Sequence, residues 1–512
     1  MGHLYLIYMW PKINNNIKLW ATYKYRTLKG GDMLIGRVSE KALLEKCYTS
    51  TESEFMVVYG RRRIGKTYLI KEFFSDKKGV FFHATGLQFG NTKKQLQNFS
   101  TTIAQVFFDD VVLTSPKDWG EAFALLHKQI IKVQTKQKVI IFLDELPWMA
   151  TRKSGLLQEI DYYWNHYWSS MKNVFLILCG SSASWLMQKI IYNRGGLHNR
   201  LTAQIGLKPF SLFEVQQYLK SRKIKLNHQH ILSLYLALGG VPYYLRYVEP
   251  GLTAEQNIQK LFFETTAPLQ DEFTKLFESL FENADSYIEL VKLIGEKQSG
   301  LTRAALQSLA KLSSGGGRLS RRLQDLCETG FLKEYTPYGK EKGEYYKLVD
   351  EFCLFFLHWV EAEKNRSFSK NYWLHKSVEP AYHAWAGCAF EMVCIKHINQ
   401  IVDALGVQAK TTSAWRVIPK NPLEEGAQID LVVDRYDEAV TLCEIKYTTQ
   451  PFVLDKAYAK QLDRKAAIFG KRTRTNKQIF WALISANGVK DSFYTEELLS
   501  RVVTLEDLFK SA

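Results

Sequence analysis

The sequence lacks the features that would place it in a membrane or in an oxidising compartment. No apolar run approaches the roughly 18 residues that a membrane-spanning helix needs. The seven cysteines are scattered and form no C-x-x-C pair, which argues against a zinc site and favours a reducing compartment. Internal repeats with the periods of solenoids are also absent. We therefore expect a cytoplasmic protein that does not bind membranes.

Acidic residues are in short supply. The 512 residues include 68 Lys and Arg against 52 Asp and Glu, which gives a formal net charge of +16. This imbalance favours an acidic polymer as partner, most often nucleic acid, and we favour DNA. Hydrophobic residues make up 46% of the chain and charged residues 23%, as in ordinary globular proteins. The length predicts three or four domains.

Residues 60–67 form the most informative segment, because they fit the pattern G-x-x-x-x-G-K-[ST] between an apolar strand and a helix start. In this pattern, backbone N–H groups surround phosphates, the lysine reaches the β and γ oxygens, and the threonine hydroxyl holds Mg²⁺. The segment predicts binding of a nucleoside triphosphate. The residues expected to hold it are Gly60, Arg61, Arg62, Arg63, Ile64, Gly65, Lys66 and Thr67.

Two further apolar strands are expected to complete this site. Residues 138–147 predict a buried strand of a parallel sheet that ends in Asp144 and Glu145. We expect Asp144 to coordinate Mg²⁺ through water and Glu145 to orient the attacking water. The strand at 174–179 is followed by Ser181 and Ser182. Ser181 is our candidate sensor of the γ-phosphate, although either serine could take this role or act as the N-cap of the next helix.

Arg200 follows a glycine-rich stretch that includes Gly195 and Gly196. A charged side chain in such a loop could reach a transferring phosphate. A solvated loop arginine is the alternative interpretation.

These segments together resemble the archaeal-type ATPases of the STAND branch of AAA+ proteins. The resemblance spans residues 34–350 and includes Arg37, residues 207–210 and residues 239–245. It implies a RecA-like P-loop core, ATP with Mg²⁺ as the bound nucleotide, and a switch rather than a fast metabolic ATPase. It also implies that Pro242 lies in a helical lid over the nucleotide base. The resemblance is compatible with a homo-oligomer.

Residues 281–365 resemble a winged helix. Thr302 is the expected N-cap of a helix at 302–306, and residues 330–335 and 345–349 are the expected wing strands. The recognition helix would present Arg318, Arg321 and Arg322 away from the buried leucines at 319, 323 and 326. These arginines could contact DNA, or they could be solvated while the module serves internal packing. The patch at 313–317 is expected to be a turn.

The C-terminal part carries a second candidate site. Two strands at 429–433 and 440–446 would form a hairpin that brings Asp430 close to Glu444 and Lys446. Two carboxylates can bind Mg²⁺, which activates water, and the lysine can position that water or neutralise charge. The motif resembles the PD-(D/E)XK nuclease core, and Glu391 matches the additional acid on its leading helix. Gln461 is followed after four residues by Lys465 rather than Tyr, which departs from the exonuclease-like branch.

A basic stretch that would suit a DNA backbone follows, although a solvated helix face explains part of it. Its residues are Lys456, Lys460, Arg464, Lys465, Lys471, Arg472, Arg474 and Lys477. We expect an α/β protein with a leader at 1–32, a P-loop ATPase core at 33–205, a helical lid at 206–280, a winged helix at 281–365 and a nuclease-like domain at 380–512. The chain is either an ATP-switched enzyme that cuts nucleic acid or a DNA-binding regulator with an inactive nuclease fold.

Overall fold

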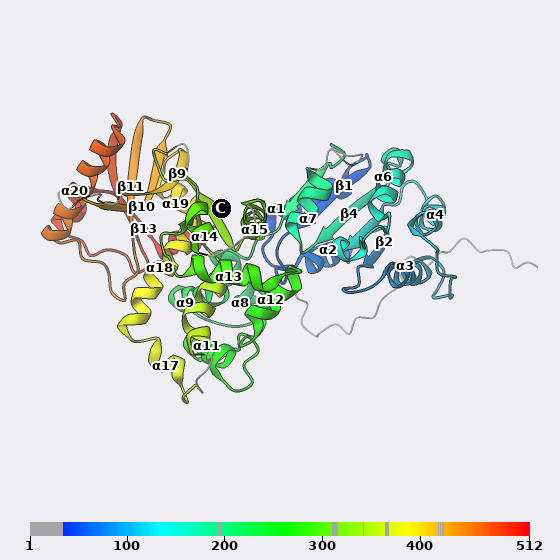
Figure 1. The fold of residues 1–512 in the computed structure, drawn as a ribbon, viewed down its shortest axis with the longest axis horizontal. Coiled ribbons are helices and arrows are strands. Elements are labelled where there is room, and N and C mark those ends of the chain that lie inside the picture. The colour runs from blue at the N-terminus through cyan, green and yellow to red at the C-terminus, as the bar shows by residue number, and fades with distance from the viewer. Residues whose placement is uncertain are drawn as a thin grey trace, which may run out of the picture.

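The computed structural model describes residues 34–192, 197, 199–309, 316–340, 343–363, 368–417, 419, 421 and 424–511. The predicted leader lies outside these residues, as do Gly195 and Gly196 and residues 313–315 of the predicted turn. Figure 1 shows two sheets at opposite ends of the molecule, with mainly helical segments between them.

A five-stranded parallel sheet forms the first region, with the order β2-β3-β4-β1-β5. Its strands are β1 (Glu54–Tyr59), β2 (Val80–Thr85), β3 (Val139–Asp144), β4 (Val174–Gly180) and β5 (Ala203–Gly206). Every residue of β3 and β4 is buried, as predicted for the centre of a covered parallel sheet. Because β4 lies between β1 and β3, the carboxyl ends of these three strands meet at one edge.

Helices cover both faces of this sheet. Val57 of β1 packs with Phe99 and Phe123 on one face, whereas its neighbour Val58 packs with Leu69 and Leu44 on the other. The helices are α1 (Val38–Thr49), α2 (Lys66–Phe74), α3 (Thr92–Phe107), α4 (Trp119–Ile130), α5 (Leu146–Met149), α6 (Leu156–His166) and α7 (Ala183–Leu186), with η1 (Trp168–Ser170) and η2 (Met187–Ile191). The arrangement confirms the predicted α/β class.

A helical segment follows the first sheet. Its elements are α8 (Leu212–Ser221), α9 (His228–Leu238), α10 (Pro242–Leu245), α11 (Ala254–Ile258), η3 (Gln259–Phe263) and α12 (Glu272–Leu280). The turn between α9 and α10 depends on Gly240, which has a φ of 67°. A Cβ atom there would lie 2.1 Å from the carbonyl oxygen of Phe210, so another residue would not fit without a backbone shift.

Three helices and a small antiparallel sheet, with the order β6-β8-β7, come next. They are α13 (Ala284–Gly295), β6 (Leu301–Thr302), α14 (Arg303–Leu309), α15 (Gly316–Glu328), β7 (Leu332–Tyr335) and β8 (Tyr345–Leu348). Thr302 caps α14 as predicted, since its Oγ1 accepts a hydrogen bond from the N–H of Ala305 at 3.2 Å. The prediction of a turn was wrong for Gly316 and Gly317, because α15 already begins at Gly316.

The C-terminal part begins with helices α16 (Glu351–Phe355), η4 (Phe356–Val360), η5 (Glu361–Glu363), α17 (Tyr372–Lys376), α18 (Pro380–Lys396) and α19 (Ile398–Leu405). A mixed sheet with the order β13-β12-β11-β10-β9 follows. Its strands and helices are β9 (Ala409–Val417), β10 (Ala427–Arg435), β11 (Ala439–Lys446), α20 (Lys456–Thr473), β12 (Gln478–Ser485), α21 (Phe493–Leu498), β13 (Leu499–Thr504) and α22 (Leu505–Leu508). The predicted antiparallel hairpin is present, although β10 extends to Arg435 and the turn is shorter than predicted.

Apolar packing separates the first sheet from the rest. Buried side chains from Phe210 to Phe509 form one cluster that includes the helical segment, the small sheet and one face of the C-terminal sheet. The first sheet has two clusters of its own. Among the described residues, no helix is long and apolar enough to span a membrane. All seven cysteines are unpaired.

Candidate functional site

The loop between β1 and α2 needs glycine at both ends. Gly60 has a φ of 142°, and a Cβ there would lie 2.4 Å from the carbonyl oxygen of Leu207. Gly65 has a φ of 91° directly before α2. Since α2 begins at Lys66, its first N–H groups point into the loop, where an anion would be stabilised.

Lys66 is buried, and its ammonium group lies inside the phosphate loop. Its Nζ donates to the carbonyl oxygens of Gly60 at 2.8 Å and Arg61 at 3.0 Å, and to Oγ of Ser181 at 3.1 Å. Phosphate oxygens are stronger acceptors for an ammonium than neutral carbonyls, so a bound triphosphate can take over these bonds.

Thr67 and Asp144 meet as predicted. Thr67 Oγ1 donates to Oδ2 of Asp144 at 2.7 Å, and Nε2 of His83 lies 3.7 Å from the same oxygen. Burial of Asp144 opposes its ionisation, but the nearby His83 and the hydrogen bond from Thr67 outweigh burial and hold the pKa of Asp144 below its ordinary value. A carboxylate next to a hydroxyl is an oxygen donor set that fits Mg²⁺. Sequence reasoning missed His83, which sits on the neighbouring strand β2.

Glu145 is held by Ser181. The backbone N–H of Ser181 donates to Oε2 of Glu145 at 3.0 Å, and its Oγ donates to Oε1 at 2.5 Å. The same Oγ accepts from Lys66, so this serine joins the lysine to the acid. Ser182 occupies the N-cap position of α7 but makes no side-chain cap hydrogen bond. The geometry therefore favours Ser181 over Ser182 as the sensor.

The side chains of two arginines of the loop point away from the nucleotide position. Arg61 is buried and forms an ion pair with Asp350. Arg63 pairs with Glu272, and its guanidinium lies 4.4 Å from the ring centroid of Tyr243. Both side chains are directed into the junction with the helical segment and with α16. Their contribution to a nucleotide is thus limited to their backbone groups.

The other predicted loop and lid residues surround the same loop. Ile64 is buried beneath it. Pro242 is the first residue of α10, and the N–H of Tyr243 contacts the carbonyl oxygen of Arg63 at 3.4 Å. The first turn of α10 therefore touches the loop backbone. The side chain of Arg62 is half-buried, and its guanidinium lies 5.5 Å from the ring centroid of Trp148.

Arg200 does not reach the phosphate loop of its own chain, contrary to our expectation. The N–H of Thr202 donates to the carbonyl oxygen of Phe55 at 2.9 Å, and β5 runs parallel to β1. Arg200 therefore lies near the amino end of β1. The phosphate loop leaves the opposite end, about 15 Å further along the strand. Arg200 itself is exposed.

In the C-terminal sheet, the structure brings Asp430, Glu444 and Lys446 together as predicted. Oδ2 of Asp430 accepts a hydrogen bond from the N–H of Ile445 at 3.0 Å, and Nζ of Lys446 lies 3.3 Å from Oε2 of Glu444. Burial, together with the nearby charge of Glu444, raises the pKa of Asp430.

Two residues of α20 complete this site, and we did not predict their roles. Nζ of Lys465 donates to Oε1 of Glu444 at 2.6 Å, and the hydroxyl of Tyr458 donates to Oε2 at 2.9 Å. Their separation of seven residues places both on one face of a helix, which is the signal that the sequence offered. We call Asp430, Glu444, Lys446, Tyr458 and Lys465 the carboxylate site.

Glu391 of α18 lies beside the carboxylate site but is paired elsewhere. Its Oε2 is 3.5 Å from Nζ of Lys347, a residue of β8. Burial raises the pKa of Glu391, while Lys347 opposes the shift and Asp430 adds to it. Within the described part of the chain, no group of three or more His, Cys, Asp or Glu side chains is placed to hold a metal ion. Lysines pair with two of the acids predicted to bind the metal, Glu391 and Glu444.

Comparisons with known proteins agree with the first site. Residues 34–248 match a family described as an ATPase domain predominantly from Archaea. An uncharacterised protein of Methanocaldococcus jannaschii is 22% identical over 445 residues, covering 86% of this chain and 93% of that protein. An uncharacterised ATP-binding protein of the same organism is 41% identical over 46 residues, covering 9% of this chain and 78% of that protein.

Solved structures show weaker overall similarity. The Walker-type ATPase of Pyrococcus abyssi has a TM-score of 0.46 and 17% identity, covering 63% of this chain and 96% of that one. The ORC2 protein of Aeropyrum pernix has a TM-score of 0.40 and 14% identity, and the match covers 65% of this chain and 95% of that one. The phosphate loop and the acids of β3 both lie within residues 34–248, and these residues form an ATPase domain that matches the family found predominantly in Archaea.

Proposed function

We propose that this chain is an ATP-driven switch of the STAND branch of AAA+ proteins that acts on nucleic acid. The observation that carries the switch is the position of Ser181, which is bonded both to Lys66 and to Glu145. Ser181 contacts both the lysine that binds phosphate and the acid that orients water. Binding or loss of the γ-phosphate would therefore change both of its hydrogen bonds. The net charge of +16 supports an acidic polymer as the partner.

In this proposal each residue of the first site has one role. Lys66 neutralises charge on the β and γ oxygens, and Glu145 accepts a proton from, or orients, the attacking water. Thr67 and Asp144 hold Mg²⁺, which when bound neutralises the phosphate oxygens. Arg200 is exposed near the amino end of β1, away from the phosphate loop of its own chain. In this proposal it contacts the nucleotide of another copy, which would require a homo-oligomer.

The remainder divides, in this proposal, into a lid at 206–280, a winged helix at 281–365 and a nuclease-like domain at 380–512. The loop between the wing strands docks on the C-terminal domain, since the N–H of Tyr338 donates to the carbonyl oxygen of Ala414 at 3.1 Å. That contact uses the wing for internal packing. Arg318 and Arg321 of α15 remain exposed and are the candidates for DNA contact.

The carboxylate site is proposed to cleave DNA phosphodiesters. Asp430 and Glu444 would hold Mg²⁺, which when bound activates water, while Lys446 and Lys465 would neutralise charge on the scissile phosphate. Exposed lysines at 456 and 460 line the start of α20. Arg464 and Arg472 of the predicted basic stretch are already paired, with Glu425 and Glu424.

One observation favours the second candidate, a DNA-binding regulator with an inactive nuclease fold. Glu444 already accepts hydrogen bonds from two lysines and one tyrosine. These donors compete with a metal ion for the oxygens of Glu444. The two candidates therefore differ in whether Glu444 can exchange a lysine for Mg²⁺.

The test is to incubate the purified full chain with single-stranded and double-stranded DNA, with and without ATP and Mg²⁺. Cleavage that requires Mg²⁺ and is lost in Asp430→Asn and in Glu444→Gln supports the nuclease. Glu497→Gln is the matched control, because Glu497 is an exposed acid on α21 of the same domain. Cleavage that survives both substitutions, or DNA binding without cleavage under every condition, leaves the regulator as the function.

A further inference from the structure

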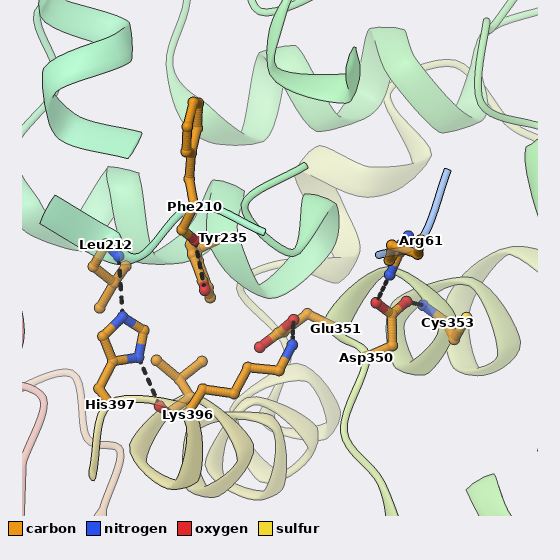
Figure 2. A network of polar contacts seen from close by, with 10 residues as sticks. Arg61, Phe210, Leu212, Tyr235, Asp350, Glu351, Cys353, Lys396 and His397 are labelled. Carbon is orange, nitrogen blue, oxygen red and sulfur yellow. Dashed lines mark hydrogen bonds and ion pairs between the residues drawn. The ribbon is translucent and has the colours of Figure 1, made fainter. Parts of the chain in front are cut away.

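Residues 347–351 contact the phosphate loop and also Glu391, the acid that lies beside the carboxylate site. Lys347 pairs with Glu391 next to the carboxylate site at 3.5 Å. Three residues later, Asp350 pairs with Arg61 of the phosphate loop. Figure 2 shows Asp350 facing Arg61 while the adjacent Glu351 faces Lys396 of α18, whose Nζ donates to it at 2.5 Å. One short segment therefore contacts the ATPase core at one end and the C-terminal domain at the other.

This segment is fixed by buried contacts rather than by a loose loop. Asp350 also caps α16, since its Oδ1 accepts from the N–H of Cys353 at 2.9 Å. The side chains of Asp350 and Glu351 are 1% and 0% exposed. A displacement of Arg61 would leave Asp350 buried and unpaired, which is costly, so the segment must follow Arg61 or lose its ion pair.

The backbone of Arg61 shares the ammonium group that a nucleotide would bind. Nζ of Lys66 donates to the carbonyl oxygens of Gly60 and Arg61, and a triphosphate competes for that ammonium group. Nε and Nη2 of Arg61 are buried without a hydrogen-bond partner among the described residues, so its present placement is not fully satisfied. Because the apolar clusters of the first sheet are separate from the large C-terminal cluster, this arginine is part of a polar junction between the two.

We propose that residues 347–351 couple the phosphate loop to the carboxylate site, so that ATP binding weakens the contact between Lys347 and Glu391 and opens the carboxylate site to nucleic acid. This inference rests on the proposed function, because it assigns ATP as the regulator of that site. Coupling between two sites is reciprocal. Removing the contact of Lys347 must therefore raise the affinity of the phosphate loop for ATP.

The first test measures the affinity of the full chain for a non-hydrolysable ATP analogue with Mg²⁺ by calorimetry. Lys347→Gln is expected to lower the dissociation constant about two- to five-fold, the range for a partly exposed ion pair. Lys340→Gln is the matched control, since Lys340 is an exposed lysine of the same hairpin. An unchanged or weaker affinity in Lys347→Gln, or an equal change in Lys340→Gln, overturns the coupling.

The second test uses the unaltered protein, so it does not depend on the folding of a variant. Hydrogen exchange is followed with and without the ATP analogue. Amides of residues 345–351 and 388–394 are expected to exchange faster when the analogue is bound, because the contact between β8 and α18 weakens. Bound analogue with unchanged or slower exchange in both segments refutes the coupling alone. Failure of the protein to bind the analogue refutes the proposed ATP switch, and the coupling with it.

Discussion

Replacing Ser181 with alanine is expected to slow ATP hydrolysis much more than it weakens ATP binding. Oγ of Ser181 is buried between two charged groups, at 3.1 Å from Nζ of Lys66 and 2.5 Å from Oε1 of Glu145. The substitution removes both hydrogen bonds at once. It leaves the backbone N–H of residue 181, which donates to Oε2 of Glu145 at 3.0 Å, so the acid keeps one of its two anchors.

The size of the effect follows from these contacts. A hydrogen bond to a charged group contributes about 1.5–3 kcal/mol. If the bond to Glu145 is the one made mainly in the transition state, its loss counts once, and the rate falls tenfold for about every 1.4 kcal/mol. The turnover number of Ser181→Ala should therefore fall about ten- to one-hundred-and-fifty-fold. Lys66 keeps its acceptors at Gly60 and Arg61, so ATP affinity should change by less than about tenfold.

Ser182→Ala is the control, because Ser182 is adjacent and makes no side-chain cap hydrogen bond at the start of α7. Phosphate release measures hydrolysis, and titration with a fluorescent ATP analogue measures binding. Ser182→Ala should match the unaltered protein in both assays. The reasoning is refuted if Ser181→Ala hydrolyses ATP at the unaltered rate, or if Ser182→Ala is the slower variant.

Three other predictions concern the loop, the junction and the basic surface. Lys66→Ala should abolish ATP binding, whereas Glu145→Gln should bind ATP and hydrolyse it about a hundredfold more slowly, as measured by the same two assays. Asp350→Asn should destabilise the protein to urea by about 3–5 kcal/mol, because it leaves Arg61 buried without its counter-ion. Burial opposes ionisation of Asp350, yet Arg61 and Lys396 hold its pKa below the ordinary value. The stability that ionised Asp350 gives the folded protein is therefore complete above about pH 4 and is lost as the pH falls through the lowered pKa. Asp350→Asn should no longer show this loss in acid unfolding. Nucleic-acid affinity should fall steeply with salt, and replacing Arg318 and Arg321 with glutamine should reduce the slope by about 0.9 for each DNA phosphate that these arginines neutralise; an unchanged slope assigns them to solvent.

Local patterns predicted the elements and the centre of the first site well. Gly60, Gly65 and Lys66 are fixed by the turn between a strand and a helix, which involves few residues. The position of Asp144 could be predicted because it ends a strand whose other residues are all apolar. Such features depend on backbone geometry and on the alternation of side chains along one element. They can be read without knowledge of how domains pack.

Contacts between domains could not be predicted in this way. Arg61 and Asp350 are 289 residues apart in the sequence, and neither flanking pattern indicates the other. Glu391 was predicted to join the acids at 430 and 444, but Lys347 from β8 pairs with it. Helix and strand periodicity shows which residues share a face of one element. It does not show which charged residue of another domain that face will meet.

The run of three arginines shows how this limitation affects the electrostatics of the site. The pattern assigns Arg61, Arg62 and Arg63 to the nucleotide-binding loop but does not say where their side chains point, and consecutive residues in a tight turn point in different directions. Arg63 has a φ of 75° and its guanidinium is directed to Glu272, while Arg61 is directed to Asp350. Each of these two charges is thus neutralised by a carboxylate of the same chain. Lys66 keeps its charge at the loop, and the two paired arginines instead connect the loop to α12 and to the start of α16, the contacts through which our proposed coupling would act.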